Sequence, residues 1–169
     1  MPIRRAHSAF FYVRALSVTA ALACSATCET APVPEERDAV ELEMEAEAAV
    51  LRHLFRTSGV DDMGFFCVSR GTFTTASDPS DQLLSKFFDH IPKVVAGSAC
   101  EGSRNGDLHR ASGESAQLFF LETTERTDAG LFKIAARHHV HGRQGATFDC
   151  TVRSEDSGWD VECRTVSIS

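Results

Sequence analysis

The sequence predicts an α+β domain, in which an N-terminal helix and a second, short helix pack on a curled antiparallel sheet that ends in a four-stranded meander. Three observations predict this fold. Apolar residues recur every three or four positions between residues 35 and 55. They alternate with polar residues in the last forty residues of the chain. Turn-forming residues separate the alternating segments.

The first helix is predicted over residues 35–55. Its apolar side consists of Val40, Met44, Ala48, Leu51 and Phe55. Glutamates crowd its first half, and Arg52, His53 and Arg56 lie near its end, an order that suits the helix dipole. The second helix begins after the capping sequence Ser77 to Asp81 and ends before Pro92.

Four further segments lie before the final strands. Strands are predicted at residues 64–74 and 116–123, and a short one at Val94 and Val95. Residues 101–114 are polar and contain glycine, so they are predicted to form a loop.

The last part of the chain predicts three antiparallel strands, at residues 132–141, 147–153 and 159–164. A three-residue turn with a left-handed Gly145 would join the first two strands and set Val140 against Phe148. In the same register Ala136 faces Val152, and Asp149 lies opposite His139.

The body of the chain contains four cysteines, and their positions predict two disulfides. A loop over residues 155–158 places Cys150 directly opposite Cys163, within reach of a disulfide. Cys67 and Cys100 then pair by elimination. Cysteines in even number are typical of an oxidising compartment.

The first residues of the chain predict export. Residues 1–23 form a signal, with Arg4 and Arg5 before a short apolar segment that ends at Ala23. Residues 24–34 have the composition of a tether, and residues 35–169 form a single α+β domain. The apolar segment is too short to span a membrane, which takes about 20 residues.

Two resemblances support the prediction of export. Ala21-Leu22-Ala23-Cys24 resembles a bacterial lipoprotein signal, which implies lipidation of Cys24, with simple secretion as the alternative. A second set of motifs comprises Ala49 to Leu54, Leu83-Leu84, Ile91 to Cys100, Ser112 to Ala116, Gly158 to Val161 and Ile168-Ser169. In this layout the chain resembles a group of small exported bacterial proteins of unassigned function, and it is similar to cystatin-like α+β folds. That resemblance implies a fold and a location outside the cytoplasm, in the periplasm, at the outer membrane or in the medium. It transfers no catalytic residue.

Charge argues against nucleic acid as a partner. The chain has 17 Lys and Arg residues against 24 Asp and Glu, and its first 23 residues hold three of the basic ones and no acidic one. The exported part therefore has a net charge of −10. Such a domain gains nothing from phosphate electrostatics.

The most suggestive local motif is His138-His139-Val140-His141. On a strand, His139 and His141 project from the same face, and Asp149 would complete a zinc or copper site. The alternative is a set of exposed histidines beside a turn. The sequence contains no G-x-S-x-G nucleophile motif and no phosphate-binding glycine loop.

These observations favour a non-enzymatic exported cell-envelope protein. It would bind an envelope protein or a small ligand with its sheet or with the loop at residues 101–114, and would touch the membrane only through a lipid on Cys24. Two alternatives are a metal-binding protein, or metal-assisted hydrolase, that uses the strand at His138 to His141, and a small hydrolase with a pocket between the sheet and the first helix. A pocket lined by a histidine and a carboxylate would favour the hydrolase, and a filled apolar interior would exclude it.

Overall fold

The structure is a computed structural model that describes residues 34–58, 63–102, 106–127, 130–141 and 144–168. The predicted export signal, the tether as far as Val33 and Cys24 lie outside these residues, so export and lipidation stay predictions. Within the described residues, no helix is long and apolar enough to span a membrane.

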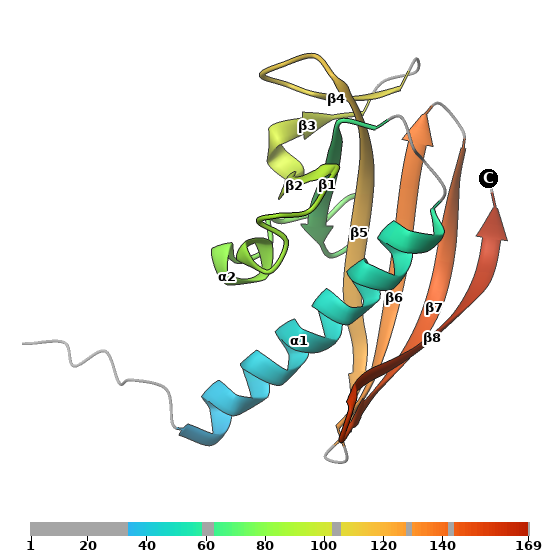
Figure 1. The fold of residues 1–169 in the computed structure, drawn as a ribbon. Coiled ribbons are helices and arrows are strands. Elements are labelled where there is room, and N and C mark those ends of the chain that lie inside the picture. The colour runs from blue at the N-terminus through green and yellow to red at the C-terminus, as the bar shows by residue number, and fades with distance from the viewer. Residues whose placement is uncertain (1–33, 59–62, 103–105, 128–129, 142–143, 169) are drawn as a thin grey trace, which may run out of the picture. The chain divides into compact units, whose positions relative to one another are not determined.

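The described strands form one mixed sheet of eight strands (Figure 1). Their bounds are Phe65–Arg70 (β1), Lys93–Ala96 (β2), Cys100–Glu101 (β3), Asp107–His109 (β4), Ser115–Arg126 (β5), Leu131–His141 (β6), Gln144–Glu155 (β7) and Gly158–Ile168 (β8). The main order is β2-β1-β5-β6-β7-β8, and β4 pairs with both β3 and β5. The α+β class is confirmed, and β5 to β8 form the predicted meander.

The prediction of a purely antiparallel sheet was wrong. β1 runs parallel to both of its neighbours, β2 and β5. The chain leaves β1, passes through the helix Asp81–Ser85 (α2) and returns in the same direction as β2. Parallel neighbours require such a crossover, whereas a hairpin always reverses the chain.

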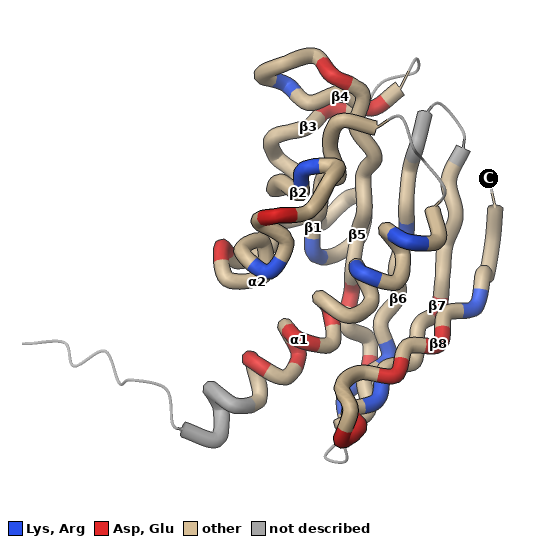
Figure 2. Tube along the Cα trace, viewed as in Figure 1, with Lys and Arg blue, Asp and Glu red and all other residues tan. Residues whose placement is uncertain are grey.

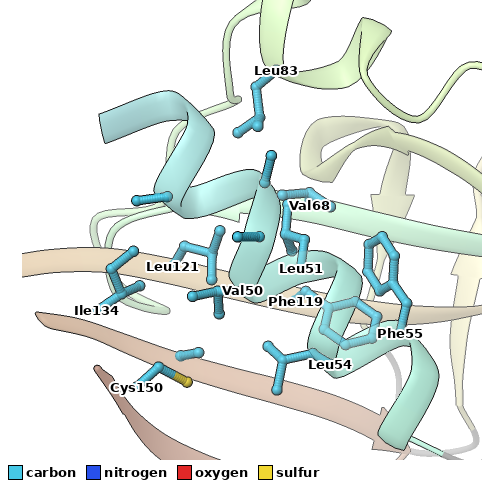
Figure 3. Close-up of a cluster of buried hydrophobic side chains, with 14 of the residues drawn as sticks. Val50, Leu51, Leu54, Phe55, Val68, Leu83, Phe119, Leu121, Ile134 and Cys150 are labelled. Carbon is cyan, nitrogen blue, oxygen red and sulfur yellow. The ribbon is translucent and has the colours of Figure 1, made fainter. Parts of the chain in front are cut away.

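One long helix, Pro34–Thr57 (α1), covers one face of the sheet. We call this the inner face, and the opposite one the outer face. Figure 3 shows Val50, Leu51, Leu54 and Phe55 of α1 among side chains from the strands. These helix residues are between 0% and 8% exposed. Together with Leu83 of α2 they form the main core.

α2 begins at Asp81, at the end of the predicted capping sequence and after Pro79, which was expected in its first turn; the Ser80 hydroxyl caps it and accepts a hydrogen bond from the backbone N–H of Leu83 at 3.2 Å. The segment predicted as a loop, residues 101–114, is partly strand, because β3 ends in it and β4 lies within it. These strands are two and three residues long, too short to produce a periodic pattern.

The predicted register between β6 and β7 was wrong by four residues. Phe148 pairs with Ala136, and Val152 pairs with Phe132. The shift is an even number, so the side chains of residues 132–139 keep their predicted faces. Gly145 is not left-handed. A Cβ atom there would lie 2.6 Å from the carbonyl oxygen of His138, so close strand approach explains the glycine.

Both predicted disulfides are present, Cys67–Cys100 and Cys150–Cys163. Cys150 and Cys163 are direct partners between β7 and β8, with Cα atoms 4.1 Å apart. Two disulfides are typical of a protein that folds outside the cytoplasm.

An ion pair connects α1 to the end of β1. Arg70 donates from Nε to Glu47 at 2.9 Å and from Nη2 to Glu43 at 2.8 Å. The Glu47 side chain is only 2% exposed. Burial raises the pKa of this carboxyl, and the Arg70 guanidinium opposes that rise. Glu47 therefore depends on Arg70 to stay charged inside the protein.

We expect Arg70→Met to lower the free energy of unfolding by about 3 kcal/mol, because it leaves a buried carboxylate without its cation. Lys133→Met removes the exposed pair with Glu125 and should cost less than about 1 kcal/mol. Urea denaturation of both variants measures the difference. Equal losses of unfolding free energy in the two variants would show that Glu47 is solvated.

Candidate functional site

A cleft with a volume of about 490 Å³ lies on the outer face of the sheet. Leu118 and Phe120 of β5 line its floor. One wall is the segment 71–78 that follows β1. The other wall is the 3-10 turn Gly97–Ala99 (η1), together with Cys100. The cleft thus lies over β1 and β5, away from α1.

The segment 71–78 is fastened at both ends. Arg70 and Ser77 exchange two backbone hydrogen bonds, at 2.8 and 2.9 Å. Asp78 accepts hydrogen bonds from the backbone N–H of Ser98 at 2.9 Å and from its hydroxyl at 2.5 Å. The Asp78 carboxylate and the Ser98 hydroxyl are therefore engaged with each other, and they hold the two walls together.

η1 lies close against β1 because residue 97 is a glycine. A Cβ atom at Gly97 would come within 1.8 Å of the Ser69 hydroxyl oxygen. A larger residue would displace the Ser69 hydroxyl and would also press against the Val68 carbonyl oxygen and Ser69 Cβ, both 3.1 Å from the added atom. The cleft is therefore built by close packing of its walls.

An exposed aromatic side chain stands at the rim. Phe73 is 63% exposed, and its ring centroid lies 5.4 Å from that of Phe120. Arg110 also lines the cleft; its Nε donates to the Cys100 carbonyl at 2.9 Å, and it pairs with Glu101 at 3.4 Å. An apolar floor with a charged rim suits a ligand with an apolar body.

A histidine–carboxylate pair lies beside this cleft. His139 Nδ1 lies 2.7 and 2.9 Å from the two carboxylate oxygens of Asp107. The Asp107 side chain is fully buried, and that of His139 is 26% exposed. Since a carboxylate can only accept, Nδ1 carries the hydrogen, which leaves Nε2 of the neutral ring as an acceptor. The ring centroid of Phe73 is 6.5 Å from that of His139, so the pair and the cleft are neighbours.

The predicted metal residues are not arranged as expected. Asp149 pairs with Ala135 and lies 3.8 Å from Arg164, so its placement opposite His139 was wrong. The register shifts between His139 and His141, which interrupts the alternation that put both on one face. The side chain of His141 lies outside the described part of the structure. No group of three or more potential metal ligands occurs among the described residues.

Sequence reasoning missed Asp107. The residue follows Gly106, whose φ is +138°, and an Asn-Gly-Asp sequence is typical of a turn. Pairing of β4 with β5 at Asp107 and Ala116 brings the carboxylate to the end of β6. No local signal distinguishes such a buried aspartate from one in an exposed turn.

A second pocket, of about 270 Å³, lies between the end of α1 and the inner face. His53 and Leu54 line it from the helix, and His138, Phe148 and Cys163 line it from the strands. The lining residues include no carboxylate. The interior here is neither filled nor equipped with the histidine–carboxylate combination that would favour a hydrolase.

His138 is one of the two histidines that line this inner pocket. Its Nδ1 is buried and has no hydrogen-bond partner within the described structure. Burial lowers its pKa, and the neighbouring His139 adds to that effect. His138 is therefore held neutral between the rings of Phe119 and Phe148.

We expect the free energy of unfolding to fall as the pH drops from about 7.5 to about 5. Unfolded His138 takes up a proton around its ordinary pKa, and the folded residue does so only at lower pH. Stability is therefore lost across that window, by at most about 1.4 kcal/mol per pH unit. In urea denaturation His138→Leu should reduce this pH dependence. His53→Leu is the control from the same pocket, and an unchanged slope in His138→Leu would contradict the assignment.

The chain matches no known family model, no curated protein and no solved structure. The resemblance to small exported bacterial proteins therefore rests on the sequence motifs alone.

Proposed function

We propose that this chain is an exported cell-envelope protein that binds an apolar ligand, or an apolar segment of a partner, in the cleft on its outer face. The observation that carries the proposal is Phe73, a large apolar side chain that is 63% exposed at the rim of a 490 Å³ cleft. Exposed apolar groups around a concave surface are typical of binding sites.

The anchoring of the cleft supports binding without catalysis. Asp78 and Ser98 hold the walls together, and the Arg110 guanidinium is engaged with Cys100 and Glu101. The disulfide at Cys100 fixes the same wall to β1. Walls that are fixed before the ligand arrives lower the entropic cost of binding.

Two disulfides and the predicted signal support the location. An oxidising compartment keeps Cys67–Cys100 and Cys150–Cys163 closed. The protein would reach the membrane through a lipid on Cys24, or act as a free protein if only the signal is cleaved. Intact mass of the exported protein, with and without reductant, distinguishes these two forms.

The test uses the fluorescent apolar probe 1-anilinonaphthalene-8-sulfonate. We expect Phe73→Ala to weaken binding of this probe at least about fivefold, because half of the aromatic pair is lost. Phe88 is 88% exposed and does not line the cleft, so Phe88→Ala is the matched control and should bind normally. Both changes are on the surface and should alter stability by less than about 0.5 kcal/mol. Equal behaviour of the two variants, or no binding by the native protein, would refute the proposal.

Hydrolytic activity would also contradict the proposed binding function. Purified protein should not hydrolyse p-nitrophenyl acetate or a generic peptide above the buffer rate. Hydrolysis that disappears in His139→Ala would replace the binding function by an enzymatic one.

The pair of His139 and Asp107 favours metal binding as a second candidate function. A carboxylate that holds one ring nitrogen fixes the tautomer and directs the other nitrogen outward, as behind many metal-binding histidines. His139 would be one ligand, with zinc or copper as the metal. Asp107 would support the site in place of the predicted Asp149.

We expect zinc chloride to give stoichiometric heat in titration calorimetry if this second function holds. His139→Ala should abolish the heat, and Asp107→Asn should weaken binding by about 10- to 100-fold. Asp149→Asn is the control and should have no effect. Absence of heat with both zinc and copper would remove the candidate.

A further inference from the structure

The sheet has two edges, and they differ in protection. β2 forms one edge and is four residues long, with a lysine at its start. β8 forms the other edge, is eleven residues long, and has β7 as its only neighbour among the described strands (Figure 1). A short edge strand with a lysine is protected against pairing, and a long one offers free backbone groups to another strand.

We propose that β8 pairs with β8 of a second copy of this chain, so that the two sheets join across a two-fold axis. The order of charges along β8 indicates that its partner is a second copy. Asp160, Glu162 and Arg164 are exposed and alternate with the inner row Trp159, Val161 and Cys163 (Figure 2).

A two-fold axis perpendicular to the sheet keeps both α1 helices on the same face. Directly opposite residues of an antiparallel pair point to the same face of the sheet, whereas successive residues of one strand alternate between the faces. The axis must therefore pass beside one residue of β8, which then lies opposite the same residue of the second copy. With Glu162 or Arg164 at the axis, a charged residue would face itself. With Val161 at the axis, Asp160 would face Glu162. Each of these registers opposes like charges directly, which destabilises a strand pair.

With Cys163 at the axis, Glu162 of each copy faces Arg164 of the other. This register creates two pairs of opposite charge and no pair of like charge among the three charged residues. The paired segment is Val161–Thr165. It ends where the register of β8 against β7 shifts, between the partners of Thr147 and Phe148.

Two features prepare the edge for pairing. The Cys150–Cys163 disulfide fixes the central residue of the segment to β7, so the edge cannot peel away. A groove of about 250 Å³ between α1 and β8 leaves Trp159 and Val161 only half-buried. A neighbouring strand would cover the open side of this groove and remove apolar surface from water.

The experiment is sedimentation equilibrium of the exported protein between about 1 and 500 µM at low salt, where a small interface of this kind should give measurable dimer. Glu162→Arg sets arginine against arginine at both positions and should raise the dimer dissociation constant at least about tenfold. The double variant E162R/R164E restores opposite charges and should return it to within about threefold of the native value.

Asp160→Lys is the matched control, because Asp160 faces no charged residue in this register and the change should have little effect. Unfolding curves of each variant check that the monomer remains folded. The ion pairs that the structure describes for Asp160 and Arg164, with Arg153 and Asp149, are exposed. A native protein that stays monomeric, a double variant that does not recover, or an Asp160→Lys as damaging as Glu162→Arg would each overturn the proposal.

Discussion

Burial of one side of α1 against the sheet is the constraint on which the rest of the structure depends. The helix supplies Ala46, Val50, Leu51 and Leu54 to the main core, each no more than 2% exposed. Without this cover, the alternating strands would have no dry face. The ion pair of Arg70 with Glu47 then fixes where the helix lies along β1, since a buried carboxylate tolerates no other position. Because α1 occupies the inner face, space for a large ligand remains on the outer face.

The two disulfides lie in parts of the sheet where little apolar surface is buried. Cys67–Cys100 belongs to the smaller outer cluster, in which Phe65, Leu118 and Phe120 are covered by short segments and not by a helix. Cys150–Cys163 secures the edge strand, whose inner residues are only partly buried. In each case a covalent bond restricts a segment that buries too little apolar surface to hold itself in place. The wall of the cleft and the edge of the sheet are thus each joined to a neighbouring strand by a covalent bond.

Much of the fold could be predicted because burial of one side of a helix or strand requires apolar residues at regular intervals in the sequence. The spacing from Met44 to Phe55 predicted the buried side of α1, and the alternation in β6, β7 and β8 predicted their faces. Val40 was expected on the same side of α1 but is 63% exposed. Alternation has a period of two, so it cannot distinguish a register from one shifted by four residues, and the pairing of Phe148 was missed for this reason. The register of Cys150 with Cys163 was correct because a short turn leaves few alternatives. The parallel position of β1 was not predictable, since both its faces are buried and it does not alternate.

The candidate site was least visible in the sequence because long-range pairing assembles it. Asp107 and His139 are 32 residues apart and meet only because β4 and β6 both lie beside β5. Phe73 reaches Phe120 although the two are even further apart in the chain, since β1 runs parallel to β5 and brings the segment after it over the floor of the cleft. The parallel position of β1 and the short strands β3 and β4 were not predicted from the sequence, and these elements create the outer cleft. A local motif such as the histidines at 138, 139 and 141 shows the chemistry that is present but not the partner that orients it. In this chain the partner is a buried aspartate from a segment with the composition of a loop.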